Sequence, residues 1–244
     1  MLTPEEARRY ARHLVLKGMG GAGQQKLKAA RVLVIGAGGL GSPVLAYLAA
    51  AGVGMLGVVD DDRVTLSNLQ RQIVHSGDSL GALKAASAGT FVAALNPHVD
   101  FVAHSMRLDT ANANGVLAGY DLVLDGSDNF DTRALVAEAA ERARLPLVSG
   151  AVSMFDGQVT VFAPHLRRPG GENCPRFADL HPERPDPADL PSCEAVGVIG
   201  ALTGVIGTLM AMEAIKLITG IGEPLLGRLL LYDGKAARFT EITY

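Results

Sequence analysis

Cysteine and basic charge are both scarce in this chain of 244 residues. Only Cys174 and Cys193 are present, too few for a disulfide framework, so we expect a cytoplasmic protein in a reducing compartment. The formal net charge of −3 leaves no basic excess to offset phosphates, which disfavours nucleic acid and anionic membranes as partners. The first residues, MLTPEEARRYARHL, lack the apolar core of a signal peptide; they predict an amphipathic helix with Thr3 as N-cap and Glu6 completing a capping box.

One uncharged stretch, Ala195 to Met212, is 18 residues long, which is close to the length of a membrane span. Its glycines and threonines, and the charges of Glu213 and Lys216 directly after it, favour a buried helix instead. Gly200 and Gly204 have GxxxG spacing, so the helix would allow close backbone approach and would also suit a subunit interface. We therefore predict no membrane span.

Strand and helix patterns alternate along the first 150 residues, which is typical of a parallel sheet with helices on both faces. Strands are predicted at Arg31–Gly36, Met55–Asp60, Asp100–His104, Asp121–Gly126 and Pro146–Gly150, and helices at Leu40–Ala51, Leu83–Leu95, Thr110–Leu117 and Asn129–Arg144. Later strands at Gln158–Ala163, Arg228–Tyr232 and Arg238–Thr243 are expected to be antiparallel, because no helix separates the last two. The expected fold class is α/β: a Rossmann-like, mostly parallel sheet flanked by helices, with antiparallel strands in the C-terminal half.

The segment RVLVIGAGGLGS places a predicted strand directly before a GxGxxG turn and a helix. Gly36 permits the tight turn, while Gly38 and Gly39 let the backbone approach a phosphate. Gly41 lets the helix pack on the strand, and the helix N-terminus attracts an anion. Asp60 follows Gly36 by 24 residues, a position that suits hydrogen bonds to ribose hydroxyls. The motif indicates a ligand with an adenosine group, with NAD, FAD, S-adenosylmethionine and ATP all open.

Charged residues beyond the ribose position distinguish these ligands. Arg71 and Lys84 follow Asp60, and a later predicted strand ends in DGSDN, which carries Asp125 and Asp128 to the carboxyl edge of the sheet. Two cations and a carboxylate there suit a triphosphate and its Mg²⁺ better than a nicotinamide. Taken singly, Arg71 is also compatible with a surface cation, Lys84 with an ordinary helix start and Asp128 with an N-cap.

Six segments together resemble the ThiF/MoeB family, the bacterial relatives of ubiquitin-activating enzymes. They are RVLVIGAGGLG, DDDRVTLSNLQRQI, LNPH at 95–98, DLVLDGSDN at 121–129, PLVSGAV at 146–152 and GVIGTLMAMEAIKLITG at 204–220. The resemblance covers nearly the whole chain. It implies a homodimeric adenylyltransferase that uses ATP and Mg²⁺ to activate the C-terminal Gly-Gly carboxylate of a ubiquitin-like sulfur-carrier protein. One domain, 1–244, would then comprise a nucleotide-binding half, 1–150, and a carrier-binding half, 151–244.

The resemblance also assigns individual residues. Its nucleotide contacts fall on Gly39, Asp60, Ser67, Asn68, Leu69, Gln70, Arg71, Lys84, Asp128 and Asn129, with Asp128 as the metal ligand. An arginine that the neighbouring subunit donates falls on Arg12. Cys193 matches a loop cysteine that the thiamine branch of the family links to sulfur transfer, with an unreactive thiol as the alternative. The motifs slightly favour the thiamine branch over the molybdopterin branch.

One departure from the family concerns a zinc site that many members build from two CxxC pairs. Here Cys174 is followed three positions later by Phe177, and no second pair precedes Tyr244, so no structural zinc is predicted. Cys174 belongs to loop 164–193, which holds seven of the chain's twelve prolines and is expected to be mobile. The two histidines near Cys174 in this loop, His165 and His181, are expected to be solvated rather than to replace the missing zinc ligands. An NAD-dependent dehydrogenase and a non-catalytic nucleotide-binding dimeric adaptor remain as alternative functions.

Overall fold

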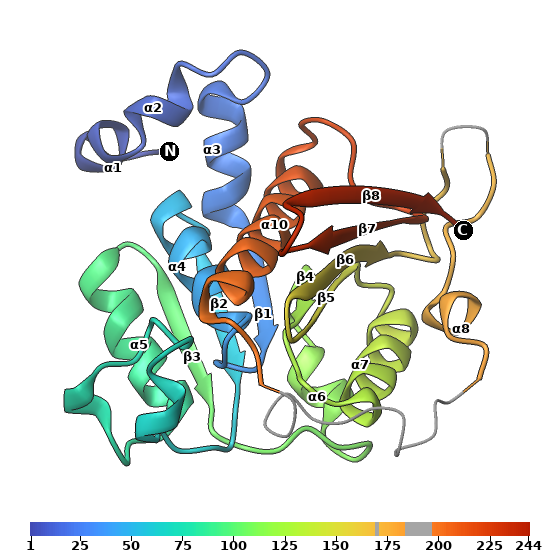
Figure 1. Cartoon of the computed structure of the whole chain (residues 1–244). Coiled ribbons are helices and arrows are strands. Elements are labelled where there is room, and N and C mark those ends of the chain that lie inside the picture. Colours follow the sequence, from blue (N-terminus) through green and yellow to red (C-terminus); the bar gives the residue numbers. More distant parts are fainter. Residues whose placement is uncertain (169–170, 184–196) are drawn as a thin grey trace.

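A single sheet organises the chain in this computed structural model, which describes residues 1–168, 171–183 and 197–244 (Figure 1). Within these residues the sheet has eight strands in the order β3-β2-β1-β4-β5-β6-β7-β8. The strands are β1 (Arg31–Ile35), β2 (Met55–Val59), β3 (Asp100–His104), β4 (Leu122–Asp125), β5 (Leu147–Ser153), β6 (Asp156–Phe162), β7 (Arg228–Asp233) and β8 (Arg238–Thr243).

The sheet changes from parallel to antiparallel at β5. Strand β1 pairs in parallel with both β2 and β4, β2 pairs with β3, and β4 pairs with β5. The pairs β5 with β6, β6 with β7, and β7 with β8 are antiparallel. The central strand reads RVLVI because helices cover both of its faces, and Val32, Leu33 and Val34 are fully buried. The predicted fold class is confirmed.

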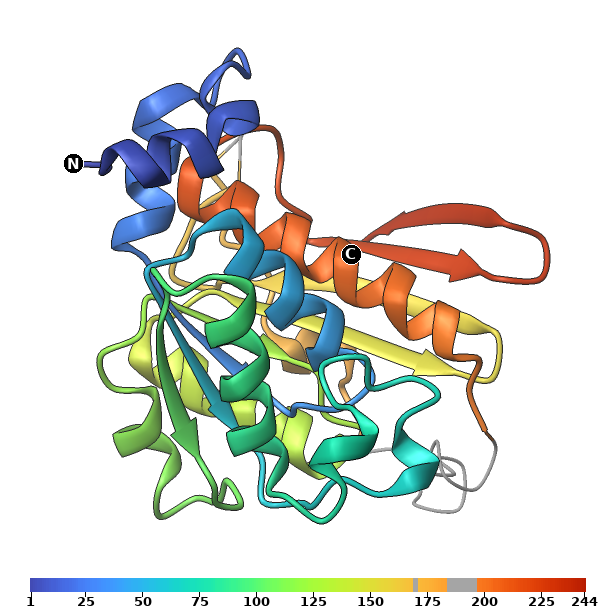
Figure 2. The ribbon, with the colours of Figure 1, turned by 90° about the vertical axis from the view of Figure 1, so that its left-hand side faces the viewer.

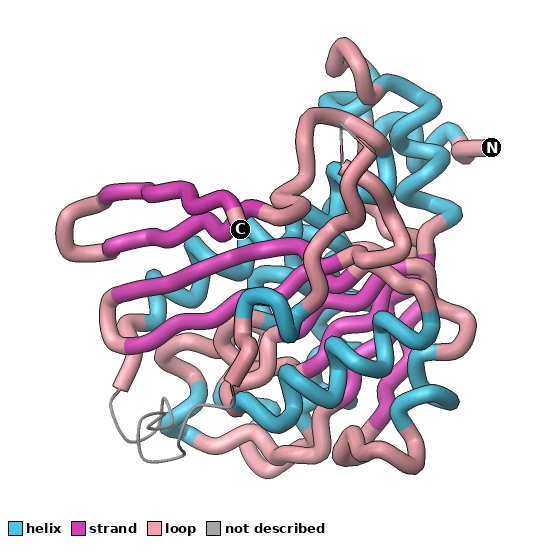
Figure 3. The backbone as a smooth tube through the Cα atoms, turned by 90° about the vertical axis from the view of Figure 1, so that its right-hand side faces the viewer, coloured by secondary structure: helices cyan, strands magenta, loops and turns pink. Residues whose placement is uncertain are grey.

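Helices cover the two faces of the sheet, each over its own apolar core (Figures 2 and 3). One face carries α4 (Gly41–Ala51), α5 (Lys84–Leu95) and α10 (Gly200–Thr219), and the other carries α6 (Ala113–Leu117) and α7 (Phe130–Ala143). The β7–β8 hairpin projects away from these layers (Figure 2). Because the crossover helices pack at the sides, the carboxyl ends of β1, β2 and β4 remain open for a ligand.

Helix α10 continues past the uncharged stretch, so Glu213 and Lys216 lie inside the helix. Glu213 is buried, paired with Lys216, and accepts a hydrogen bond from the Leu225 amide at 2.8 Å. Among the described helices, α10 alone has the length and apolar composition of a membrane span. In this structure it packs against α4, β5 and β6, as the core helix of a folded domain does. Close packing occurs at Gly200 and at Gly207, where a Cβ would lie 2.6 Å from the Leu40 carbonyl oxygen.

The N-terminal segment folds into three short helices, α1 (Pro4–Arg9), α2 (Ala11–Leu14) and α3 (Gly20–Ala29). The predicted capping box is present: the Glu6 amide donates to Thr3 Oγ1 at 3.2 Å, and the Thr3 amide donates to Glu6 Oε2 at 2.7 Å. Helix α3 had no sequence-based prediction, because glycines occupy its first turn and give it a weak helical pattern. Helix α6 begins three residues later than expected, since the Asp109 side chain accepts the Ala111 amide and forms a turn first.

The described part of loop 164–193 is more packed than expected. It contains α8 (Phe177–Leu180), and Cys174 is buried with its pKa raised by burial. His181 is half-buried rather than freely solvated: its ring lies 4.6 Å from the Phe177 ring and 5.7 Å from the Phe130 ring, measured between centroids. Apolar contacts with α7 therefore hold this segment on the sheet layer, and burial lowers the pKa of His181.

Acid stability should depend on Glu6. A hydrogen bond from Lys28 (2.8 Å) and one from the Thr3 amide lower the pKa of Glu6 to about 2. A lowered folded-state pKa stabilises the protein above the unfolded pKa of 4.5, and that contribution is lost as the pH falls toward 2. We therefore expect Glu6→Gln to lower the melting temperature at pH 7 and to approach the wild type below pH 3. Glu138→Gln, at an exposed ion pair, is the control; an equal Tm for Glu6→Gln and wild type at pH 7 would contradict the assignment.

Candidate functional site

A cavity of about 320 Å³ opens at the carboxyl ends of β1, β2 and β4. This is the edge of the sheet where open α/β folds bind their ligands. The walls include the glycine turn after β1, the acids after β2, the start of α5, the turn after β4 and the first turn of α7. The charged and amide side chains of the lining are Asp60, Asp61, Asp62, Arg71, Gln72, Lys84, Arg107, Asp128, Asn129 and Arg133.

The glycine turn has the geometry of a phosphate-binding loop. Gly36 has a φ of 90°, a left-handed conformation that side-chain-bearing residues rarely adopt. A Cβ on Gly41 would lie 1.9 Å from the Gly36 carbonyl oxygen, so Gly41 serves packing and does not line the cavity. Gly38 and Gly39 do line it, and α4 starts directly behind them without a side-chain cap. Within α4 the Ser42 amide already donates to the Gly38 carbonyl at 3.0 Å and Pro43 has no N–H, so the backbone that faces an anion is that of the glycine turn itself.

Asp60 holds the glycine turn from the end of β2. Its Oδ2 accepts the Ala37 amide at 2.8 Å, and its Oδ1 accepts the Asp62 amide at 2.9 Å. Burial raises the pKa of Asp60, opposed by the Ala37 hydrogen bond and by the charge of Lys84. A carboxylate oxygen accepts more than one hydrogen bond, so Asp60 retains acceptor capacity toward the cavity.

Lys84 is a buried cation whose ammonium group forms an ion pair with Asp62, another residue of the cavity wall. Its side chain is 8% exposed, and its Nζ lies 2.8 Å from Asp62 Oδ2. The Lys84 amide also donates to the Asp62 carbonyl at 2.9 Å, so the two residues are joined through both side chain and backbone. Arg71 lines the same cavity and donates from Nη1 to the Ser67 carbonyl at 3.1 Å. Two cations, Arg71 and Lys84, thus line the same cavity as Asp60.

The turn after β4 presents Asp128. Asp125 is fully buried and accepts the Ser127 amide at 2.9 Å, and burial raises its pKa. Arg133 donates from Nη2 to the Ser127 carbonyl at 2.8 Å, which fixes the turn from α7. Asn129, not Asp128, caps α7, by accepting the Thr132 amide at 2.9 Å. Within the described chain the Asp128 carboxylate accepts only the Asn129 amide group, at 3.4 Å, which leaves it available to a cation.

The cavity brings together most of the residues that the sequence suggested. Those in its lining are Gly36, Gly38, Gly39, Asp60, Arg71, Lys84, Asp128 and Asn129; those outside it are Gly41, Ser67, Asn68, Leu69 and Gln70. Asn68 instead closes the short helix η1 (Leu66–Asn68) that leads to Arg71, by accepting the Thr65 amide at 3.1 Å. Arg12 is exposed on α2 at the opposite end of the sheet, and Cys193 lies outside the described residues (Figure 1).

Sequence reasoning missed Asp62, Gln72, Arg107 and Arg133 as cavity residues. Arg133 had a usable signal, because it lies four residues after Asn129 and so shares the first turn of α7 with it. Asp62 had a weaker signal, because it is the third of three consecutive aspartates that begin with Asp60. Gln72 directly follows Arg71 in DDDRVTLSNLQRQI, and Arg107 follows the predicted strand Asp100–His104 at the same carboxyl edge, so the position of each gave a signal that was not used.

No group of three or more histidine, cysteine, aspartate or glutamate side chains that could hold a metal occurs in the described part of the chain. These residues therefore offer no ligand set for a structural zinc ion, and the absence of the family's zinc site stays a prediction. For Mg²⁺ the donor set is one open carboxylate, Asp128, beside the cationic wall. That set fits an ion which takes one or two protein carboxylates and completes its shell with phosphate oxygens and water.

Curated relatives align along almost the whole chain. The probable adenylyltransferase/sulfurtransferase MoeZ of Mycobacterium tuberculosis is 50% identical over 242 residues, covering 99% of this chain and 61% of MoeZ. Sulfur carrier protein adenylyltransferase of Thermus thermophilus is 50% identical over 241 residues, covering 99% of this chain and 88% of the relative. The SAMP-activating enzyme E1 of Haloferax volcanii is 46% identical over 236 residues, with coverages of 97% and 84%. The chain therefore spans less than two thirds of MoeZ, and none of these names belongs to the thiamine branch.

Solved structures and a family comparison agree with these relatives. PaaA has a TM-score of 0.81 at 19% identity, covering 100% of this chain and 84% of that one. E. coli MccB with MccA-N7isoASN has a TM-score of 0.80 at 21% identity, covering 97% and 71%. At such identities the likeness concerns the fold alone. The ThiF family model matches residues 10–244, and with relatives at 50% identity this shows that the chain belongs to the ThiF family.

Proposed function

We propose that the protein is an ATP-dependent adenylyltransferase that activates the C-terminal Gly-Gly carboxylate of a ubiquitin-like sulfur-carrier protein. The products are a carrier acyl-adenylate and pyrophosphate. The observation that carries the proposal is the gathering of Arg71, Lys84 and Asp128 in one cavity with Asp60 and the glycine turn. The names of the Mycobacterium and Thermus relatives support the same reaction class.

The nucleotide would enter with its ribose at Asp60 and its α-phosphate over Gly38 and Gly39. This placement uses the acceptor capacity of Asp60, the exposed backbone of the glycine turn and the positive end of the α4 dipole behind it. The β- and γ-phosphates then extend toward Arg71 and Lys84, where Arg gives forked donation and Lys a point charge. A nicotinamide in the same place would meet charged side chains rather than an apolar slot.

The chemistry requires alignment rather than a base. A peptide C-terminal carboxylate has a pKa of about 3.5, so it is already an ionised nucleophile at neutral pH. It attacks the α-phosphorus, the bond from that phosphorus to the bridging oxygen breaks, and pyrophosphate leaves with the electron pair. Arg71 and Lys84 neutralise the charge that builds on the leaving group. Asp128 would hold Mg²⁺, which when bound supplies further neutralisation of the phosphates.

The homodimer and the donated arginine remain proposals. Arg12 is exposed and does not line the cavity of its own chain, which is the arrangement expected if it completes the site of a second copy. Cys193 is proposed as an acceptor for sulfur or for the carrier, and adenylation itself does not require it. We place the reaction in a reducing, cytoplasmic compartment.

The relatives' names also bear on the carrier. MoeZ and the SAMP-activating enzyme are not named for thiamine synthesis, so we propose a MoaD-like or SAMP-like carrier ahead of a ThiS-like one. With such a carrier, the protein would act in molybdopterin synthesis or in another sulfur-transfer pathway.

ATP–pyrophosphate exchange with individual Gly-Gly-ended carriers tests the proposed function. Labelled pyrophosphate should enter ATP only when a carrier with an intact C-terminus is present. A nucleotide-binding adaptor would bind ATP and show no exchange with any carrier, and a dehydrogenase would instead change nicotinamide absorbance. Either result would replace the proposal.

Asp62 should affect turnover through Lys84. Asp62→Asn removes the charge that holds the Lys84 ammonium at 2.8 Å while keeping the shape of the side chain. We expect exchange to fall by roughly tenfold, because a misplaced cation neutralises the leaving group less well. Asp78→Asn is the control, since Asp78 is an exposed aspartate outside the cavity lining and its exchange rate should equal the wild type. Equal exchange rates for both variants would remove Asp62 from the account.

A further inference from the structure

Arg12 lies on a helix that cannot hold its own position. Helix α2 has only four residues, Ala11–Leu14, and a single isolated turn is unstable in water. It has no side-chain N-cap and none of its residues is buried. Contacts with other elements must therefore fix the direction in which Arg12 points.

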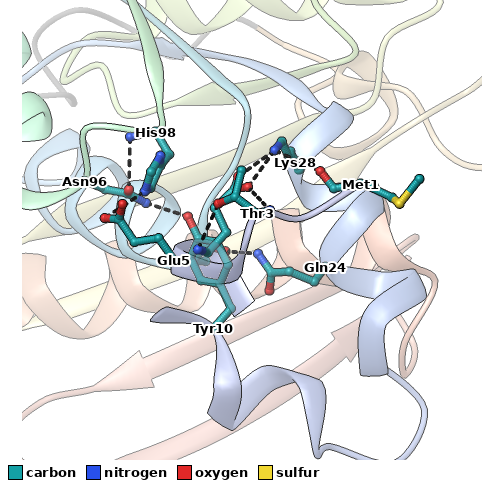
Figure 4. A network of polar contacts seen from close by, with 10 residues as sticks. Met1, Thr3, Glu5, Tyr10, Gln24, Lys28, Asn96 and His98 are labelled. Atoms are coloured by element: carbon teal, nitrogen blue, oxygen red, sulfur yellow. Dashed lines mark hydrogen bonds and ion pairs between the residues drawn. The ribbon is translucent and has the colours of Figure 1, made fainter. Parts of the chain in front are cut away.

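Two side chains on either side of Arg12, those of Tyr10 and His13, provide those contacts; Figure 4 shows Tyr10 beside Asn96. Tyr10, directly before α2, is 4% exposed, and its hydroxyl accepts a hydrogen bond from Asn96 Nδ2 at 2.8 Å. His13, directly after Arg12, donates from Nδ1 to Gln24 Oε1 at 2.9 Å. Ala11 and Arg12 are thus the exposed residues between two anchored ones, and Arg12 is the one with a charged side chain.

Both anchors end on the C-terminus of α4. Asn96 Nδ2 also donates to the Ala49 carbonyl at 2.7 Å, and Gln24 Nε2 donates to the Ala51 carbonyl at 2.8 Å. These are carbonyls of the last turn of α4, where the regular hydrogen bonds of the helix run out; Ala49 also accepts the amide of the C-cap Gly52, at 3.1 Å. Asn96 and Gln24 are each fully buried, so these hydrogen bonds are shielded from water.

The backbone of α4 is shaped for this contact. Its C-cap, Gly52, has a φ of 81°, and a Cβ there would lie 2.4 Å from the Tyr10 hydroxyl. Helix α4 begins at Gly41 in the phosphate-binding turn, so one rigid helix joins that turn to the anchors of Arg12. Outer contacts add to the attachment of α1: Glu5 lies 3.2 Å from His98, and Arg9 donates to the Leu95 carbonyl at 3.1 Å.

We propose that Tyr10, His13, Gln24 and Asn96 are positioning residues, which hold α2 on the end of α4 so that Arg12 reaches the nucleotide site of a second copy of this chain. This inference rests on the proposed adenylyltransferase function and on Arg12 acting in the second subunit. The four residues touch neither the nucleotide nor the carrier, and they act only through Arg12.

Subunit mixing tests the proposal. The double variant Tyr10→Phe/His13→Leu removes both hydrogen bonds to the Arg12 segment but leaves Asn96 and Gln24 in place to cap α4. Its exchange activity should fall about tenfold or more, while the KM for ATP changes less than twofold because its own cavity is intact. Tyr120→Phe is the matched control, since it removes a tyrosine hydroxyl bonded to His104 at 2.8 Å far from α2; its activity should equal the wild type.

The pattern of rescue separates positioning from a general loss of structure. Mixed with Arg71→Ala subunits, the double variant should recover about a quarter of wild-type exchange, because half of the dimers are mixed and each holds one complete site. Mixed with Arg12→Ala subunits it should recover nothing. Tyr10→Phe alone, a milder change, should give the same pattern if the double variant folds poorly.

Three results would overturn the inference while leaving the function standing: full activity of the double variant, a raised KM for ATP, or no recovery with Arg71→Ala subunits. The carrier used is the one that supports exchange by the wild-type protein. Absence of exchange by the wild type with every carrier would instead overturn the proposed function.

Discussion

Arg71→Ala is expected to reduce carrier-dependent ATP–pyrophosphate exchange by about 10²-fold or more, equivalent to about 2.7 kcal/mol of transition-state stabilisation. Arg71 lines the same cavity as Asp60, and its guanidinium donates to the Ser67 carbonyl at 3.1 Å. That position suits charge that develops on departing pyrophosphate. The effect should therefore lie mainly in kcat, with a smaller rise in the KM for ATP.

Controls distinguish a phosphate contact from an ordinary surface cation. Arg142→Ala removes an exposed arginine paired with Glu138 at 3.5 Å and should leave exchange unchanged. Arg71→Lys keeps the charge but loses the forked donor, so an intermediate rate is expected. If Arg71→Ala and Arg142→Ala both retained wild-type exchange, Arg71 would be a surface residue.

Asp128→Asn should have the second large effect, again about 10²-fold on exchange at ordinary Mg²⁺ concentrations. The substitution keeps the shape of the side chain but removes the negative charge that would hold the ion. Since Asn129 and Arg133 fix the turn independently, through the Thr132 amide and the Ser127 carbonyl, we expect the fold to survive.

Two readouts besides the rate make this prediction specific. The Mg²⁺ concentration for half-maximal exchange should rise in Asp128→Asn, and Mg²⁺ should no longer strengthen ATP binding measured by calorimetry. Asp156→Asn, at the exposed start of β6, is the control and should match the wild type. An unchanged Mg²⁺ dependence in Asp128→Asn would show that the ion is held elsewhere.

The fold could be predicted largely because local pattern and tertiary environment agree. RVLVI is apolar throughout since both faces of β1 are covered, and the glycine spacing follows from backbone contacts such as that of Gly41 with Gly36. Helix α3 escaped prediction because its stability comes from packing rather than from its glycine-containing first turn. His181 looked like a solvated loop residue, and only the fold shows the phenylalanine rings that partly cover it.

The candidate site was predictable where a residue type and its place after a strand carried the information, as for Asp60 and Asp128. Pairings across the cavity were not. Nothing in the sequence indicates that Asp62 holds the Lys84 ammonium, because 22 residues separate them and the contact depends on how the chain returns to α5. The anchoring of Arg12 by Tyr10 and Asn96 is hidden for the same reason, since it spans 86 residues.

The most direct test of the central claim is a crystal structure of the protein with Mg²⁺ and a non-hydrolysable ATP analogue. The account predicts ribose hydroxyls at Asp60, the β- and γ-phosphates between Arg71 and Lys84, and the ion on Asp128. Phosphates that stopped at the glycine turn, with Arg71, Lys84 and Asp128 all remote from the ligand, would contradict it.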